Sequence, residues 1–308
     1  MDENELDEIK SEYDLNSELG KNVQLLGQKE IQNQLNSPKL DGGLWLKSHA
    51  GLINPAKLAW GLKRVAIELG VRFYENTPMV RSRMKGRSVI VQTPMSQIRA
   101  DKVILASNAF TCGKRKISSR VVAIRDRIIV SEPLTSDQLK ALKWDNRQGV
   151  RNTRTQLTYM RLTHDNRILF GGRIGYFYNN GTEANHDQRS DVYTGLVECL
   201  YETFPVLVGK PISHAWSGPI ALTKRMTAFY QPFHEGNMLY AGGYSGFGVA
   251  ASRFIAKVGL AIIDNIDIPE RKLSFVQSRP GWIPHEPLRW IGTKLTVIAL
   301  NSDDKKGR

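Results

Sequence analysis

Cysteine and long apolar runs are both scarce in this sequence. The 308 residues include two cysteines, Cys112 and Cys199. Two thiols this far apart make neither a CxxC metal site nor a disulfide framework, so we expect a reducing, cytoplasmic location. The longest apolar stretch, residues 254–263, contains Lys257 and is much shorter than the roughly 18–20 residues of a membrane span. The sequence therefore predicts no membrane partner.

Several catalytic and leader motifs are also absent. The six histidines are scattered along the chain and show no metal-ligand spacing, so we predict no metal site. There is no GxSxG nucleophile turn, no P-loop and no GxGxxG dinucleotide turn. The first residues, MDENELDEIK, are acidic and polar, unlike a signal or transit peptide. The function must therefore be inferred from motifs that are less specific.

The charge of the chain is basic and unevenly distributed. Lys and Arg number 43 against 30 Asp and Glu, a net charge of +13. Residues 1–18 hold eight acidic residues and one lysine, so the rest carries an excess of 20 positive charges. A basic body suits nucleic acid, an acidic partner or an anionic cofactor, or is simply a solvated surface. The densest cluster, residues 114–116, lacks the interleaved aromatic residues of nucleic-acid sites. We therefore predict no nucleic-acid partner and keep a basic binding module as an alternative.

The apolar pattern in the first third of the chain predicts an α/β unit. Residues 1–36 are polar and predict two weak helices. Asn54 and Pro55 mark the start of a helix, with Asn as the N-cap and Pro at the first helical position. This helix is expected to end at Gly70, where positive φ is commonly needed, and to lead into a strand at residues 71–74.

The pattern then changes twice. Residues 78–100 predict a small antiparallel meander, and residues 103–106 form an apolar run that predicts a strand buried on both faces. Residues 120–225 mix strands with two separate helices, which predicts an α+β unit with an antiparallel sheet. The chain returns to α/β character with a strand at 238–241 and a helix at 249–263. The expected fold class is thus α/β plus α+β.

Between that last strand and helix lies the sequence GGYSGFG, residues 242–248. Glycines allow positive φ and a close approach of a ligand to the backbone. The N-terminus of the following helix presents unpaired N–H groups and a partial positive charge, which suit a pyrophosphate or the electron-rich edge of a flavin. The spacing is not GxGxxG, so the turn alone is equally well explained as the packing of a helix on a sheet.

Several short segments follow one another along the chain: GGL at 42–44, AGLINPAKL at 50–58, ELGV at 68–71, ADKVILASNA at 100–109, RILFGGR at 167–173, FP at 204–205, HAWSGP at 214–219 and AGGYSGFGVA at 241–250. Their order resembles the FAD-dependent amine and D-amino-acid oxidase (DAO) family, which includes glycine oxidase, sarcosine oxidase and γ-glutamylputrescine oxidase. The resemblance runs from about Gly42 to Ile263, and the tail segment WIPHEPLRW, residues 282–290, looks like the γ-glutamylputrescine-oxidase-like branch.

Members of this family open with a strand, a GxGxxG turn, a helix and an acidic residue that holds the adenosine ribose. This sequence lacks that first βαβ unit, and residues 1–40 resemble the middle of the family's chain. The resemblance implies an N-terminally truncated member, in which an incomplete FAD-binding Rossmann-like domain accompanies an antiparallel-sheet substrate domain. The expected domains are a helical remnant (1–40), a partial FAD-binding domain (41–118), a substrate domain (119–225), the closing strand and helix of the FAD-binding domain (226–265) and a tail (266–308).

The resemblance also implies roles for residues at the site. Trp216 and Tyr244 would face an amine substrate, and Arg173 would contact an acidic group of that substrate because guanidinium suits carboxylates. Trp216 has a second interpretation as a core residue, and Arg173 as a surface arginine; no catalytic residue is assigned. The cofactor-binding residues would be Gly242, Gly243, Gly246, Phe247 and Gly248 in the turn, Ser107 and Asn108 after a strand, and Val80 beside the adenine, unless Val80 is an ordinary strand residue.

The implied reaction is hydride transfer to flavin from a C–H beside an amine nitrogen. The lysine that grips a substrate carboxylate in the sarcosine oxidase branch is matched by Ala250, so an amine is expected rather than a small α-amino acid. The cysteine that tethers flavin in that branch is matched by Met226, so FAD is expected to be non-covalent. The alternative is a non-catalytic truncated remnant that does not hold FAD by itself. A separate N-terminal fragment would then be the partner that completes the cofactor site.

Overall fold

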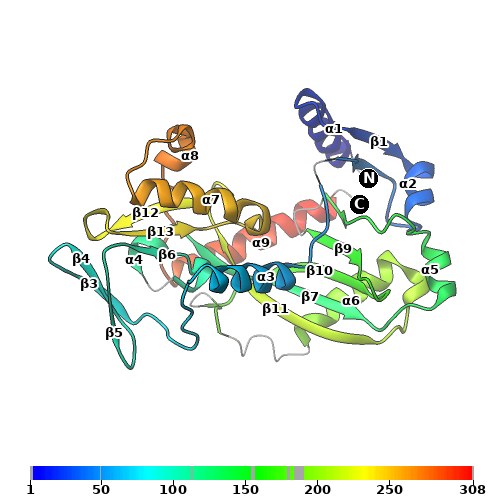
Figure 1. Ribbon diagram of the computed structural model, residues 1–308. Helices are drawn as coiled ribbons and strands as arrows, with labels where there is room; N and C mark the ends of the chain where they lie inside the picture. Colours follow the sequence, from blue (N-terminus) through cyan, green and yellow to red (C-terminus); the bar gives the residue numbers. More distant parts are fainter. Residues whose placement is uncertain are drawn as a thin grey trace.

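The computed structural model describes residues 3–48, 50–111, 114–153, 157–178, 181–183 and 191–306. They form a five-stranded sheet, a three-stranded sheet beside it, a three-stranded meander and a two-stranded N-terminal unit (Figure 1). Short helical turns join these parts: η1 (Asn108–Thr111), α4 (Arg115–Ser118), η4 (Pro205–Leu207), η5 (His234–Gly236), η6 (Pro269–Lys272) and α8 (Ser274–Gln277).

The five-stranded sheet is the antiparallel layer that the sequence predicts within residues 120–225. Its strands run in the order β11-β7-β10-β9-β8, and every neighbouring pair is antiparallel. Helices α5 and α6 cover one face, where Ile129, Phe170 and Leu196 are completely buried. The elements are β7 (Val122–Ser131), α5 (Ser136–Leu142), β8 (Val150–Arg151), β9 (Thr158–Leu162), β10 (Ile168–Gly175), α6 (Asp191–Thr203) and β11 (Ile212–Leu222).

The smaller sheet has the order β12-β13-β6, in which β6 and β13 are parallel. Helix α7 covers one face through contacts such as that between Ile255 and Leu239. The sequence analysis missed β12. It was also wrong to bury residues 103–106 on both faces, because β6 is an edge strand and Ile104 is 38% exposed. The elements are β6 (Val103–Leu105), β12 (Phe229–Phe233), β13 (Met238–Gly242) and α7 (Gly248–Ile263).

The two sheets share a second core. Ala123 of β7 and Ala221 of β11 are completely buried in the same cluster as Leu105 of β6 and Tyr240 of β13. Strands β7 and β11 therefore run from the larger sheet into the packing of the smaller one. The expected meander also joins this cluster, and it consists of β3 (Arg81–Lys85), β4 (Ser88–Gln92) and β5 (Gln97–Ala100).

The N-terminal unit contains a strand that the sequence analysis did not predict. Residues 1–36 were expected to be two helices, but α1 (Glu3–Glu18) and α2 (Gln28–Gln34) enclose β1 (Val23–Gly27), which pairs with β2 (Gly42–Leu46). The pairing with β2 overrides the weak helical preference of this segment. Glu12 forms an ion pair with Arg151 of β8 at 3.0 Å, so this unit is linked to the larger sheet.

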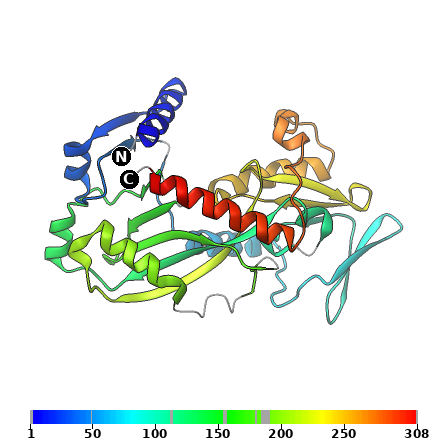
Figure 2. The same ribbon diagram turned by 180° about the vertical axis from the view of Figure 1, so that it is seen from behind.

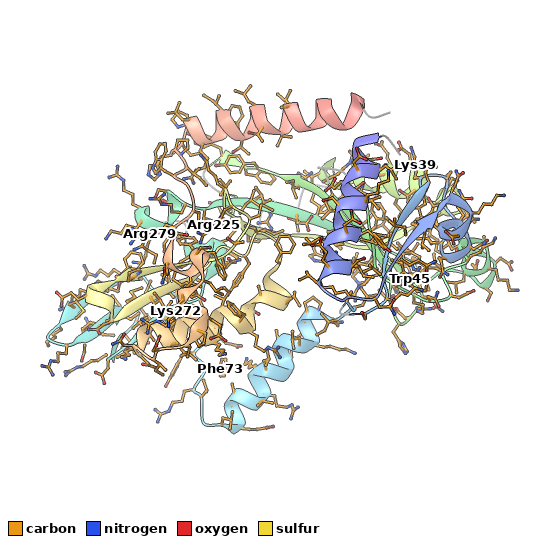
Figure 3. The ribbon with its side chains drawn as sticks, turned by 90° about the horizontal axis from the view of Figure 1, so that it is seen from above. Lys39, Trp45, Phe73, Arg225, Lys272 and Arg279 are labelled. Carbon is orange, nitrogen blue, oxygen red and sulfur yellow. The ribbon has the colours of Figure 1, made fainter. Side chains whose placement is uncertain are left out.

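Helix α3 (Pro55–Glu68) forms as the sequence predicts, but it is poorly covered. The Asn54 side chain accepts a hydrogen bond from the backbone N–H of Lys57 at 3.1 Å, as an N-cap does. None of its side chains is buried, and Trp60 and Leu62 are 68% and 62% exposed. Figures 1 and 3 show α3 lying along one side of the molecule, and Figure 3 shows it projecting from the body.

The strand expected at residues 71–74 is not formed. A strand needs a neighbour for its backbone groups, and among the described residues no strand pairs with this segment. Instead the segment turns back along α3, where the ammonium of Lys63 lies 5.6 Å from the ring centroid of Phe73, labelled in Figure 3.

The tail crosses the side of the molecule opposite α3, as Figures 2 and 3 show for α9 (Leu288–Lys306). It is attached by buried Arg289, which donates hydrogen bonds to the carbonyl oxygens of Pro284 and Ser118. The hydroxyl of Tyr176 donates to the carboxylate of Glu286 nearby. Within the described part of the chain, no helix is long and apolar enough to cross a membrane.

Candidate functional site

Except for Val80, the residues expected at the cofactor lie at one edge of the smaller sheet. Strands β6 and β13 are parallel, with Leu105 paired to Tyr240 in register. Their carboxyl ends therefore lie at the same edge, where ligands of open α/β sheets bind. Ser107 and Asn108 follow β6, and Gly242 ends β13. The parallel pairing thus brings together two of the groups that the sequence analysis singled out separately.

Asn108 links the two strand ends directly. Its side-chain oxygen accepts a hydrogen bond from the backbone N–H of Gly243 at 3.0 Å. Asn108 itself has a φ of 46°, a left-handed conformation that asparagine tolerates better than most residues. The hydroxyl of Tyr240 donates to the carbonyl oxygen of Asn108 at 3.4 Å. The segment after β6 is therefore held against the start of the glycine-rich turn.

The glycine-rich turn has a backbone that needs its glycines. Gly243 and Gly246 have φ values of +83° and +93°, which glycine adopts without steric cost. A Cβ on Gly243 would also lie 2.9 Å from the side chain of Thr223. The next residue but one, Ser245, is buried and donates its backbone N–H to the carbonyl oxygen of Ala221 at 2.9 Å. The turn is thereby fixed to the end of β11.

The geometry of this turn fits the flavin end of FAD. Helix α7 begins at Gly248, so the N–H groups of its first turn point out of the turn with partial positive charge. A Cβ on Gly246 would meet no atom within 4 Å, and Phe247 is 64% exposed. A planar, electron-rich ring edge can approach this backbone closely. The described residues supply no GxGxxG turn between a strand and a helix, so they fit the flavin end and not the pyrophosphate end.

The structure places three other residues expected at the site as follows. Tyr244 belongs to the glycine-rich turn, but its side chain is half-buried against the core beneath α7, and burial raises the pKa of its hydroxyl. Val80 is 62% exposed just before the meander, and its N–H donates to the carbonyl oxygen of Gln92 at 2.8 Å. Arg173 lies beside α6, because a Cβ on Gly195 would be 2.3 Å from its guanidinium. The structure does not bring Val80 and Arg173 together with the glycine-rich turn.

Trp216 lies on the face of the larger sheet that α6 does not cover. It is the register partner of Ile128, whereas the next residue, Ile129, points into the core under α6. Neighbouring residues of a strand point to opposite faces. The Trp216 side chain is 40% exposed, so it is accessible, as a residue facing a substrate must be.

The same face carries an acidic group that the sequence analysis missed. The hydroxyl of Tyr159 on β9 donates a hydrogen bond to Oδ2 of Asp126 on β7 at 2.7 Å. Between these two strands lies β10, and Tyr159 passes over its Gly171, where a Cβ would be 2.2 Å from the ring. Burial raises the pKa of the Asp126 carboxyl above its usual value. The Gly171–Gly172 pair inside an apolar strand was the available signal, since such glycines mark close approach.

Among the described residues no group of histidine, cysteine, aspartate and glutamate side chains is arranged to hold a metal ion. The polar groups at the site are instead hydroxyls, amides, backbone N–H groups and the one carboxylate of Asp126. Such a set can bind an organic cofactor and orient an amine beside it.

The chain is similar to several known proteins. The model of a family described as FAD dependent oxidoreductase (DAO) matches residues 1–259. A probable oxidoreductase, OrdL, of Haemophilus influenzae is 29% identical over 81% of this chain and 56% of its own length. Gamma-glutamylputrescine oxidoreductase of Escherichia coli is 33% identical over 77% of this chain and 54% of its own length. The chain thus spans about half the length of the curated relatives it matches.

Solved structures show the same fold. Glycine oxidase from Geobacillus kaustophilus superposes with a TM-score of 0.74 at 17% identity, covering 90% of this chain and 72% of that chain. L-proline dehydrogenase from P. horikoshii gives a TM-score of 0.69 at 18% identity, with coverage of 89% and 71%. The expected combination of α/β and antiparallel α+β layers is therefore confirmed.

Proposed function

The chain belongs to the DAO family of FAD-dependent oxidoreductases, and from this premise we propose that it oxidises a CH–NH bond of an amine. The cofactor of this family is FAD. The observation that carries the proposal is the hydrogen bond from the backbone N–H of Gly243 to the side chain of Asn108. It fixes the glycine-rich turn in front of the N-terminus of α7. That arrangement suits the electron-rich edge of a flavin.

When bound, FAD supplies a two-electron hydride acceptor. The amine loses a hydride from the carbon beside its nitrogen and becomes an iminium ion, which water then hydrolyses to a carbonyl compound and a free amine. The chain's own residues position the partners. The first turn of α7 would hold the ring edge, Asn108 keeps the turn in place, and Trp216 would shape the substrate side from the face of the larger sheet that α6 does not cover.

Two positions support a non-covalent cofactor and an amine substrate. Met226 is 46% exposed and carries a thioether, which cannot form the thioether link that a cysteine makes to flavin. Ala250 lies exposed in the first turn of α7 and offers no charge to a substrate carboxylate. We propose a cytoplasmic reaction, because two cysteines, Cys112 and Cys199, do not form the disulfide framework that oxidising compartments favour.

We propose further that a separate N-terminal segment completes the pyrophosphate end of the site. The support is the exposed apolar surface of α3, where Trp60, Leu62 and Ile67 are 68%, 62% and 52% exposed. Apolar side chains gathered on one element are normally covered by another element. Residues 71–74 have the composition of a strand but pair with no described strand. This also indicates that a neighbouring element would normally lie beside them.

The proposed activity is tested by the visible spectrum of the purified chain, before and after FAD is added. Flavin absorption near one equivalent, bleached by an amine under anaerobic conditions, supports an amine oxidoreductase. A chain that stays colourless with added FAD, and also with a strand–GxGxxG–helix fragment taken from a relative, contradicts it. The Asn108→Gly variant should retain less flavin than the wild type, whereas Asn265→Gly, at another exposed left-handed position, should retain as much.

A further inference from the structure

Helix α9 carries a stripe of apolar side chains that the rest of the described chain leaves uncovered. Leu288, Ile291, Leu295 and Ile298 are 63%, 45%, 62% and 64% exposed. They recur at steps of three, four and three residues, so they lie one above another along the helix. We call this stripe, formed by these four residues, the α9 seam. It presents to solvent an apolar surface about three helical turns long.

The opposite face of α9 is turned toward the body of the protein, across which Figure 2 shows the helix lying. Arg289 is buried, and Thr293 and Val297, one and two turns further along, are half-buried. At about 100° per residue, these three positions lie opposite the α9 seam. The guanidinium of Arg289 donates to the carbonyl oxygen of Ser118 and so attaches the start of the helix. The attachment therefore does not use the α9 seam.

The composition of α9 requires packing for the helix to be stable. Five of the eight residues from 291 to 298 are β-branched, and Gly292 is a sixth residue with low helix propensity. Among the side chains of residues 290–299, none is buried. Helices in proteins gain most of their stability from the packing of an apolar face. Because alternating steps of three and four residues are typical of the contact line between two helices, the α9 seam fits another helix.

The α9 seam is complementary to a second copy of itself. Positions 288 and 298 are centred on residue 293, and so are positions 291 and 295. A twofold axis at Thr293 therefore places Leu288 of one copy against Ile298 of the other, and Ile291 against Leu295. Each residue of the seam then has an apolar partner. A parallel pair would also match apolar residues, so the charges at the two ends of α9 decide between the two arrangements.

The surroundings of the two ends of α9 are opposite in charge. At its start, Arg289 contacts Ser118 of α4, in which Arg115 and Lys116 are exposed. At its other end, α9 comes close to α1, as Figures 2 and 3 show. The exposed acidic residues of α1 are Asp7, Glu8, Asp14 and Glu18. An antiparallel pair brings the acidic α1 of each copy toward the basic α4 of the other, whereas a parallel pair brings like charges together.

We infer that the protein forms a dimer with twofold symmetry, in which the α9 seams of two copies pack against each other antiparallel. The same surface is used by both copies, so the contact closes on itself and does not extend into a filament. The charged ends flank the apolar centre, as a polar rim flanks the apolar core of a stable interface. The occupant of the α9 seam is thus a second copy of this chain.

Sedimentation equilibrium of the purified chain tests the dimer without FAD, so its outcome is independent of the proposed oxidation. The wild type should dimerise reversibly. Leu295→Glu should raise the dissociation constant at least about 100-fold, because each of the two copies then places a carboxylate where an apolar side chain packed. The matched control is Leu62→Glu, which changes a leucine of α3 with the same exposure of 62%. This control should dimerise like the wild type.

Disulfide cross-linking tests the antiparallel direction. A mixture of the Leu288→Cys and Ile298→Cys variants should form a cross-linked dimer with one copy of each, because the two positions face each other. The Leu288→Cys variant alone should cross-link no more than the wild type, which has the same native cysteines. In the antiparallel pair its two new cysteines lie about 15 Å apart along the helices, which is beyond the reach of a disulfide.

A wild type that stays monomeric would overturn the inference. So would a Leu295→Glu variant that dimerises like the wild type, or a Leu62→Glu variant that loses the dimer. Cross-linking of Leu288→Cys with itself above the wild-type level would overturn the antiparallel pairing. A strand–GxGxxG–helix fragment from a relative provides the last comparison. If this fragment dissociates the dimer and Leu295→Glu prevents its binding, the α9 seam belongs to the N-terminal segment and not to a second copy.

Discussion

The hydroxyl of Tyr159 lies 2.7 Å from Oδ2 of Asp126, although β10 separates the strands from which the two side chains come. The tyrosine ring reaches across because Gly171 leaves the space above β10 empty. Residues of three strands thus place one carboxylate on the face of the sheet that α6 does not cover. This contact restricts the side chains allowed at Asp126, Tyr159 and Gly171. A substitution at one of them should therefore change the effect of a substitution at another.

Gly171→Ala should destabilise the protein by about 1–3 kcal/mol, the usual cost of overpacking. The added Cβ would lie 2.2 Å from the Tyr159 ring. The ring must therefore move, and the hydrogen bond from its hydroxyl to Asp126 is lost. Urea unfolding measures the loss. Gly218→Ala is the control, because a Cβ there meets no atom within 4 Å. The cost should largely vanish in a Tyr159→Ala background, and equal costs in both backgrounds would contradict the overlap.

The stability of the protein should depend on pH through Asp126. Burial raises the pKa of this carboxyl in the folded state above its unfolded value. The folded protein then binds this proton more tightly, so protonation stabilises the fold as the pH falls, and that contribution is lost as the pH rises through the folded pKa. Asp126→Asn mimics the neutral form. Its free energy of unfolding relative to the wild type should therefore be higher at pH 7 than at pH 4.

The check is a pair of urea titrations at the two pH values, with Asp145→Asn as the exposed control. A difference between Asp126→Asn and the wild type that is the same at both pH values would show that the carboxyl does not titrate with folding.

Local patterns predicted most elements of the fold. The Asn54–Pro55 start of α3, the meander and the strand and helix around the glycine-rich turn all depend on short-range signals, namely caps, turns and apolar periods. Errors occurred where a distant partner decides. Residues 23–27 are a strand because β2 pairs with them, and residues 71–74 are not a strand because no described strand does.

The candidate site divides in the same way. Asn108 and the glycine-rich turn were proposed from the family resemblance, and the parallel pairing of β6 and β13 brings them together. Asp126 and Tyr159 are 33 residues apart, and only the register of three strands places them side by side. The register between distant strands cannot be inferred from a single sequence, so the contact between Asp126 and Tyr159 could not be predicted.

Asn108→Gly should destabilise the protein by about 1 kcal/mol, because the N–H of Gly243 loses the acceptor that it has at 3.0 Å. Glycine suits the φ of 46° at this position, so backbone strain does not contribute. Asn108→Asp keeps an acceptor and should retain most of the stability. Denaturant unfolding compares the variants, with Asn265→Gly correcting for the entropy of a new glycine in the unfolded chain. If Asn108→Gly and Asn265→Gly lower the free energy of unfolding equally, the hydrogen bond of the Asn108 side chain does not stabilise the turn.

Arg225 should hold the segment around α8 against β12. Its guanidinium donates to the carbonyl oxygens of Ala228 and Phe275 at 3.0 and 2.7 Å and to the hydroxyl of Ser278 at 2.7 Å. Arg225→Ala should increase amide hydrogen exchange in residues 273–278 at least tenfold, since hydrogen bonds from a charged donor contribute about 1.5–3 kcal/mol. Exposed Arg279, labelled with Arg225 in Figure 3, is the control and should have no such effect when changed to alanine. If amide hydrogen exchange in residues 273–278 is unchanged in Arg225→Ala, contacts other than those of Arg225 hold this segment against β12.

Strands β7 and β11 pack into the cores of both sheets, and they are paired with each other over ten residue pairs. Bending the molecule between the glycine-rich turn and the larger sheet would have to break this ladder, so these two parts cannot separate about a hinge. The spacing between the glycine-rich turn and Asp126 is therefore fixed by the pairing of β7 with β11 and by the hydrogen bond from Ser245 to Ala221.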